Sequence, residues 1–247
     1  MKHRIVPSIV CADRARLAEE TRAVVAAGAD ALHFDVMEVD ELTRLALGHG
    51  EAQALKRHLR RGDGTAAPLE VHLGVAPLDA LVERFVEAGA DLLSFHADAA
   101  TDVERTLRLV RMSGCRTGLA FEPAAPLDAL ERTIGLVDQV LLMSVHPGYG
   151  GQAFIEGSLR RLEQARRLVD AERARSGREV RLAVEGGIHA GNIRRAADAG
   201  ADTFVVGSAV FGRQGRAAAT AALRVALAGT AARTPTETAG ADLALAA

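Results

Sequence analysis

The sequence has 247 residues, of which 49% are hydrophobic and only 3% aromatic, so it can form one large domain with a core of Ala, Val, Leu and Ile. Its 30 Lys and Arg residues nearly balance 32 Asp and Glu, and a net charge of −2 gives no sign of a nucleic-acid-binding surface. No apolar run approaches the roughly 18 residues of a transmembrane helix.

The cysteines and the first residues indicate the compartment. Cys11 and Cys115 form neither a disulfide framework nor a metal-binding spacing. The segment MKHRIVPSIV lacks the long apolar region and the small-residue cleavage site of a signal peptide. We therefore expect a cytoplasmic protein that has neither a membrane nor a nucleic acid as its partner.

Short β-branched segments alternate with longer amphipathic segments along the chain. The predicted strands are Arg4–Ser8, Ala31–Met37, Leu69–Leu73, Leu92–His96, Arg116–Phe121, Gln139–Ser144, Arg181–Glu185 and Thr203–Gly207. Helical spacing of apolar residues marks segments between them, including Arg14–Ala27, Leu78–Ala88, Asp102–Ser113 and Ser158–Ser176.

The number of these units decides between two α/β architectures. Eight strand–helix units are typical of a closed (β/α)8 barrel, the TIM barrel, whereas a doubly wound sheet usually has five or six strands. We therefore predict a single-domain (β/α)8 barrel over residues 1–228. The Ala/Thr-rich tail, residues 229–247, is expected to be disordered.

The tetrapeptide Ala-Gly-Ala-Asp occurs three times, each time between a predicted helix and the next strand, with the acids Asp30, Asp91 and Asp202. Glycine suits the left-handed position beyond a helix end, and Asp can bond the backbone of the short turn that follows. Since strand starts form the stability face of a barrel, we interpret these acids as structural.

Ionisable residues occupy the C-terminal ends of several predicted strands, where barrel enzymes build their chemistry. His33 and Asp35 are two residues apart on one strand and point to the same side, while His72 and Glu185 lie at the ends of two others. Either histidine alone would indicate a core residue bonded to its neighbours. Two imidazoles and two carboxylates that converge on a barrel mouth instead favour one divalent ion: Zn²⁺, Mn²⁺, Fe²⁺ or Co²⁺.

Glycine-rich segments follow the last three predicted strands. They are His146–Gln152, Gly186-Gly187 and Gly207-Ser208. Glycine lets backbone N–H groups approach an anion closely, and the loops after strands seven and eight of a barrel frequently form a phosphate site. These segments indicate a phosphorylated substrate that binds near Glu185.

Four segments form specific motifs: His33–Met37, Val71–Leu73, Leu142–Phe154 and Val184–Gly187. They resemble the ribulose-phosphate 3-epimerase family, and the similarity runs from about residue 7 to residue 212. The resemblance implies a homo-oligomeric barrel enzyme that holds one divalent metal with two His and two Asp. It also implies a reaction in which two carboxylates remove and return the C3 proton of a ketose phosphate through a metal-stabilised enediolate.

The resemblance assigns roles residue by residue. His33, Asp35 and His72 match three metal ligands, and Glu185 stands at the fourth; Asp35 and Glu185 stand at the two catalytic carboxylates. The residues that the resemblance places around the substrate are Ser8, Met37, His72, Met143, Gly148, Gly151, Gly186, Gly187, Gly207 and Ser208.

Three departures from the family concern the substrate. Glu185 replaces an Asp, so its carboxylate reaches further by one methylene. The loop Glu38–Arg44 lacks the family's Gly, Phe, Pro and Asn, and Arg44 is either an added anion contact or an exposed salt-bridge partner. Gly74 replaces a Met, which leaves room for a bulkier substrate or for water. We therefore expect the substrate to be ribulose 5-phosphate (or xylulose 5-phosphate) or a related pentulose, hexulose or heptulose phosphate.

Two other functions stay open at this point. One is an aldolase, decarboxylase or isomerase that uses the same enediolate chemistry. The other is a non-catalytic sugar-phosphate-binding barrel in which Glu185 is a damaged base.

Overall fold

The computed structural model describes residues 2–37, 47–146, 151–212 and 215–229. The substituted loop Glu38–Arg44, Gly148 and all but the first residue of the predicted tail lie outside these ranges.

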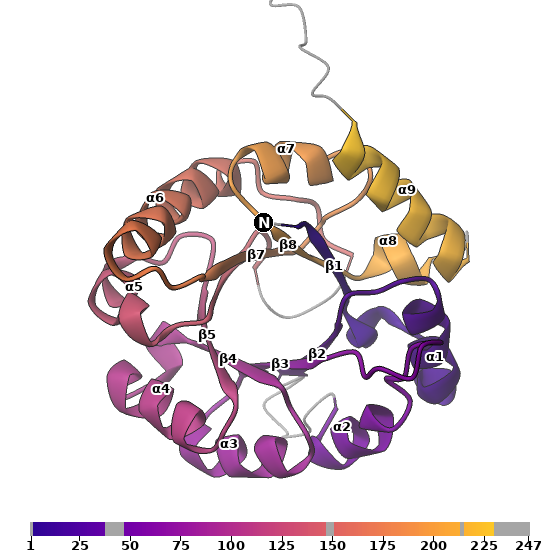
Figure 1. The fold of residues 1–247 in the computed structure, drawn as a ribbon, viewed down its shortest axis with the longest axis horizontal. Helices are drawn as coiled ribbons and strands as arrows, with labels where there is room; N and C mark the ends of the chain where they lie inside the picture. Colours follow the sequence, from indigo (N-terminus) through magenta and orange to yellow (C-terminus); the bar gives the residue numbers. More distant parts are fainter. Residues whose placement is uncertain (1, 38–46, 147–150, 213–214, 230–247) are drawn as a thin grey trace, which may run out of the picture.

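Parallel strands form an inner ring, and helices surround it (Figure 1). The strands are β1 (Arg4–Pro7), β2 (Leu32–Met37), β3 (Leu69–Gly74), β4 (Leu92–His96), β5 (Arg116–Phe121), β6 (Gln139–Met143), β7 (Arg181–Glu185) and β8 (Thr203–Val206). Each strand from β2 to β7 pairs with the next along the chain, and β8 pairs with β1. A parallel bridge between Ser8 and His33 links β1 to β2. The predicted (β/α)8 barrel is confirmed.

The α-helices of the described residues are α1 (Leu17–Ala26), α2 (His49–Lys56), α3 (Leu78–Glu87), α4 (Val103–Met112), α5 (Asp128–Thr133), α6 (Ser158–Ser176), α7 (Ile193–Asp198), α8 (Ser208–Phe211) and α9 (Arg216–Ala228). The first predicted helix divides into a 3-10 turn, Arg14–Arg16, and α1. None of the described helices combines the length and the apolar character that a membrane crossing requires.

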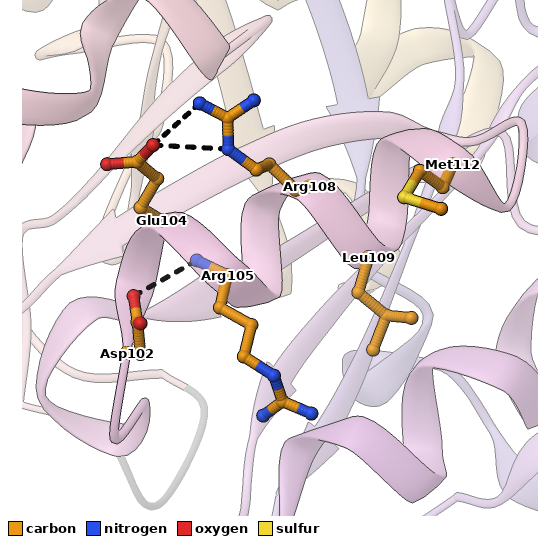
Figure 2. Close-up of a pocket in the computed structure, with 6 residues that line it drawn as sticks. All are labelled: Asp102, Glu104, Arg105, Arg108, Leu109 and Met112. Atoms are coloured by element: carbon orange, nitrogen blue, oxygen red, sulfur yellow. Dashed lines mark hydrogen bonds and ion pairs between the residues drawn. The ribbon is translucent and has the colours of Figure 1, made fainter.

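Helix α4 illustrates how local sequence sets a helix boundary. It begins after Asp102 because the Asp102 carboxylate accepts a hydrogen bond from the backbone N–H of Arg105 at 3.0 Å (Figure 2). The guanidinium of Arg108 pairs with Glu104 one turn earlier on the exposed face. The opposite face buries Leu107 and Val110 against the barrel.

The barrel interior is asymmetric. The main apolar core lies between the strands and the helices, and a second, smaller cluster consists of Ala120, Leu141, Met143, Val145, Ala183 and Val205. The residues of this second cluster belong to the β5–β8 side. Ser8, Asp35 and His72, by contrast, are buried polar residues from the β1–β3 side. The apolar cluster therefore lies on one side of the interior, and these three buried polar residues lie on the other.

The three acids of the Ala-Gly-Ala-Asp repeats are structural in a way that corrects the sequence interpretation. Each accepts a hydrogen bond from a neighbouring strand rather than from its own turn: Asp30 from Ile5 N at 2.8 Å, Asp91 from Leu69 N at 2.7 Å and Asp202 from Leu182 N at 3.3 Å. Asp138, which has no such repeat before it, accepts from Thr117 N in the same way. These carboxylates hold the N-terminal ends of the strands in place and lie at the opposite end of the barrel from the candidate site residues.

A buried ion pair closes the end of the interior where the strands begin. Glu70 is fully buried, and its carboxylate pairs with Arg4 at 2.6 Å and accepts a hydrogen bond from the Gln139 side chain at 3.3 Å. Burying a charge is costly, so the stability of the fold depends on the Glu70 carboxylate keeping its ion-pair partner.

Replacing Arg4 by Met is therefore expected to lower the free energy of unfolding by about 3–5 kcal/mol, because it leaves the Glu70 carboxylate buried without its cation. The matched control is Arg108→Met, which breaks an exposed pair and should cost only about 0–1 kcal/mol. Urea titrations of both variants compare the two costs. Equal losses would show that burial does not strengthen the Arg4–Glu70 pair.

Candidate active site

Four ionisable side chains meet at the mouth of the barrel. His33 and Asp35 project from β2 on the same face, and Asp35 is paired in register with His72 of β3. Glu185, the last residue of β7, reaches the same point from the other side of the ring. One ligand atom from each of the four lies within 4.8 Å of all the others.

The distances within this cluster suit metal ligands. His33 Nε2 lies 3.3 Å from Asp35 Oδ1 and 3.2 Å from Glu185 Oε2, while His72 Nδ1 lies 3.1 Å and 3.5 Å from the same two oxygens. Ligand atoms about 2.0–2.2 Å from a tetrahedral ion are themselves about 3.4 Å apart. The four donor atoms are thus spaced as a small divalent cation requires.

The hydrogen bonding of the cluster is incomplete. His33 Nε2 and Glu185 Oε2 are buried, yet neither has a hydrogen-bond partner of suitable geometry among the described residues. Buried polar atoms are normally paired, and unpaired ones need an explanation. A divalent cation held by the four residues would satisfy these lone pairs, so the residues present fit a divalent metal.

The electrostatics of the cluster favour positive charge at its centre. Burial opposes the protonation of His33, but the carboxylates of Glu185 and Asp35 outweigh it and raise the His33 pKa well above its usual value. Burial likewise opposes the ionisation of Asp35, yet His33 and His72 hold its pKa well below the usual range. The pKa of Glu185 is also lowered, because His33 and His72 outweigh burial and the repulsion from Asp35.

Two serines orient the carboxylate-bearing segments. The Ser8 hydroxyl donates a 2.6 Å hydrogen bond to Asp35 Oδ2, which leaves Oδ1 directed at the two histidines. The Ser144 hydroxyl lies 2.7 Å and 2.6 Å from the backbone carbonyl oxygens of Glu185 and Gly186 and donates to them. Sequence reasoning noted Ser144 at a strand end but did not assign it to the site.

Two methionines lie near the cluster, and one of them corrects a sequence interpretation. Met143 belongs to the apolar cluster inside the barrel. Met37 fills the space beside Gly74: a Cβ added to Gly74 would overlap Met37 Sδ and lie 2.9 Å from Met37 Cε. The room that the sequence predicts at Gly74 is therefore occupied by the Met37 thioether.

The loops after β6, β7 and β8 form a groove of about 600 Å³. Three predicted substrate-binding residues, Gly151, Gly187 and Ser208, line it together with Gln152 and Asn192. Among the described residues, the structure thus brings together part of the predicted phosphate site.

The predicted residues Gly186 and Gly207 do not line this groove, and close packing explains why they are glycines. Gly186 has φ +112°, and a Cβ there would lie 2.5 Å from Val145 Cγ2. A Cβ at Gly207 would lie 2.5 Å from the Cys11 sulfur.

Sequence reasoning missed two residues of the site region. The buried Asn192 side chain accepts from His189 N and donates to Gly187 O, both at 2.8 Å, and so fixes the loop after β7. His96, at the end of β4, stacks on His72 with ring centroids 4.9 Å apart. Burial, reinforced by His72, lowers the His96 pKa to about 4, so its imidazole is neutral near pH 7. The only sequence signal for His96 is its place at a strand end.

Other solved structures have the same barrel fold. Orotidine 5'-phosphate decarboxylase from Pyrococcus horikoshii OT3 matches with a TM-score of 0.64 at 16% identity, covering 92% of this chain and 100% of that one. KGPDC from Streptococcus mutans matches with a TM-score of 0.63 at 13% identity, covering 92% and 98%. At these identities the likeness shows the fold alone.

Sequence relatives are much closer. The ribulose-phosphate 3-epimerase of Serratia marcescens is 47% identical over 212 residues, which cover 86% of this chain and 97% of the relative. The protein of that name from Escherichia coli (strain K12) is 45% identical over 210 residues, covering 85% and 89%. The family model described as "Ribulose-phosphate 3 epimerase family" matches residues 4–211.

These matches confirm the resemblance seen in the sequence and the expectation of an isomerase. They span both strands that carry the histidines, the strand that ends in Glu185 and the glycine loops. The chain belongs to the ribulose-phosphate 3-epimerase family.

Proposed function

We propose that this chain is a divalent-metal-dependent epimerase that inverts C3 of a pentulose phosphate and interconverts ribulose 5-phosphate and xylulose 5-phosphate. The observation that carries the proposal is the cluster of two imidazoles and two carboxylates within 4.8 Å at the barrel mouth. The names of the relatives support the pentulose phosphate over its longer homologues.

His33, Asp35, His72 and Glu185 would hold the metal. A divalent cation supplies positive charge that stabilises the negative charge left on the substrate when its C3 proton is removed. Zn²⁺, Mn²⁺, Fe²⁺ and Co²⁺ all accept this set of nitrogen and oxygen donors.

Asp35 and Glu185 are the proposed acid and base. Inversion at a carbon needs a group on each face of the planar intermediate, one to remove the proton and one to return it. Asp35 comes from β2 and Glu185 from β7, so the two carboxylates approach the centre of the mouth from different sides. The extra methylene of Glu185 does not keep its Oε2 from the histidines, which lie 3.2 Å and 3.5 Å away.

The groove lined by Gly151, Gly187 and Ser208 is proposed to bind the phosphate. Glu185 directly precedes Gly186-Gly187, so a phosphate held there would bring the sugar carbons toward the acid. Backbone N–H groups of glycine loops suit this task because no side chain keeps the anion away.

Product analysis tests this proposal against the other reactions of the same chemistry. We expect NMR of metal-loaded protein with ribulose 5-phosphate to show xylulose 5-phosphate as the product, with the carbon chain and the carbonyl position unchanged. Cleavage of a C–C bond, loss of CO₂ or movement of the carbonyl would replace the proposal with an aldolase, a decarboxylase or an aldose–ketose isomerase.

Replacing Ser8 by Ala is expected to lower kcat about tenfold to hundredfold, because a hydrogen bond to a charged group contributes about 1.5–3 kcal/mol. The lost bond is the 2.6 Å contact that orients Asp35. Since Ser8 donates to Oδ2 and not to the oxygen that faces the histidines, metal affinity should change much less than kcat. Equal losses in both would mean that Ser8 supports the metal site and not the proton transfer.

A further inference from the structure

Met37 and Gly74 are partners at the ends of β2 and β3. They are paired directly in register, two residues beyond Asp35 and His72 respectively. Both therefore point to the same inward side as the metal cluster, one step nearer the mouth.

Contact with Met37, and not backbone conformation, explains why residue 74 is a glycine. Gly74 is not among the glycines with positive φ, so its backbone suits any residue. A Cβ at Gly74 would, however, overlap Met37 Sδ and lie 2.9 Å from Met37 Cε. The Met37 thioether thus occupies the place of the inward side chain that β3 lacks, directly beyond His72.

This contact lies opposite the phosphate groove. The groove belongs to the loops after β6, β7 and β8, whereas β2 and β3 lie across the ring from β7 (Figure 1). In a 2-ketose phosphate, the phosphate and the C1 group are at opposite ends of the carbon chain. With the phosphate in the groove and C3 between the carboxylates, the C1 end points toward Met37.

We propose that Met37 and Gly74 form a specificity-determining contact that receives the C1 end of the ketose phosphate. This inference rests on the proposed function. The surface that this contact offers the substrate consists of the Met37 thioether and the Gly74 Cα. Neither group provides a strong hydrogen-bond partner or a charge. The surface accepts an uncharged hydroxymethyl or methyl group and rejects a second phosphate at C1, because burying an unpaired charge is costly.

The packing half of the proposal is tested without turnover, by NMR of protein labelled at the methionine methyl groups. The chain has four methionines. Met112 is 86% exposed on the outer helix α4 and serves as an internal reference (Figure 2). The variant Gly74→Ala should shift the Met37 signal and leave that of Met112 in place.

Gly50→Ala is the matched control, because Gly50 lies on α2 with ordinary φ and open space around its Cα. It should shift neither signal. A Met37 signal that stays in place in Gly74→Ala would overturn the packing half of the proposal.

A double-mutant cycle tests the functional half. Gly74→Ala should lower kcat/KM about tenfold to hundredfold by displacing the thioether, since about 1 Å of misplacement can cost that much in catalysis. Metal affinity should not change. In a Met37→Ala background, which removes the overlap, Gly74→Ala should have little further effect.

The result that overturns this half is an equal loss from Gly74→Ala in both backgrounds. Wild-type protein should also turn over 1-deoxyxylulose 5-phosphate at least about a hundredfold faster than ribulose 1,5-bisphosphate, and comparable rates would refute the specificity. A wild type that turns over no ketose phosphate would refute the proposed function, and the methyl NMR result would still decide the packing.

Discussion

Replacing Asp35 by Asn is expected to lower the rate of epimerisation about 10⁴-fold, because a positioned acid or base contributes up to about that factor. Asn keeps the shape of the side chain and its contact with Ser8, but it can neither accept the C3 proton nor supply a negative charge to the cluster. Rates measured from both epimers check the expectation. Glu104→Gln, on the outer face of α4, is the control and should be fully active.

The corresponding variant Glu185→Gln should lose epimerisation to a similar extent. Comparing it with Asp35→Asn should also show which face of the substrate carbon C3 each carboxylate approaches. With one acid removed, the other can still take the C3 proton of the epimer whose hydrogen faces it. Each variant should therefore exchange C3 hydrogen with D₂O from one epimer, without inversion, and the two variants should prefer opposite epimers. Exchange from the same epimer in both would contradict the two-sided arrangement of Asp35 and Glu185.

Replacing His33 by Ala is expected to weaken metal binding by at least about 100-fold, since even the loss of a group that only supports a ligand costs 10–100-fold. The buried His33 Nε2 lies 3.2–3.3 Å from both carboxylates, so its loss opens one side of the cluster. Competition with a fluorescent chelator measures the affinity. His58→Ala changes a half-buried histidine that pairs with Arg22 outside the four-residue cluster; it is the matched control and should bind metal as the wild type does.

Chelation should have a linked effect on stability. A ligand that binds only the folded protein stabilises it by about 4 kcal/mol when present at 1,000 times its dissociation constant. The wild type and His58→Ala should therefore lose thermal stability when a chelator is added, whereas His33→Ala should change little. A chelator-induced loss of the same size in His33→Ala would show that the stabilising metal binds elsewhere.

The fold was predictable from the sequence because the signal is repeated. Eight β-branched segments separated by amphipathic ones define the barrel, and the observed strand ends differ from the predicted ones by one residue or none. For example, the first strand ends at Pro7 and leaves Ser8 to form the bridge to His33. Strand counting also placed the ends of β2, β3 and β7, and hence the cluster of His33, Asp35, His72 and Glu185, at one mouth.

Contacts between side chains of different strands were not predictable in this way. The sequence shows that Gly74 lacks a side chain, but the place of the Met37 thioether depends on a choice among side-chain rotamers on the neighbouring strand. The three repeated Asp residues bond to strands 20 to 25 residues away in the chain. Rules for local turns do not predict contacts over such separations. His96 joins the site by stacking on His72, a diagonal contact that depends on the register between the neighbouring strands β3 and β4.

Metal-dependent exchange of the C3 proton is measured by incubating the wild type, with its bound metal counted, with ribulose 5-phosphate in D₂O and recording proton NMR spectra. We expect about one divalent ion per chain, loss of the C3 proton signal and the appearance of xylulose 5-phosphate deuterated at C3. Chelation should abolish the reaction, and added metal should restore it. Protein with its full complement of metal that leaves the C3 proton in place would contradict the proposed function.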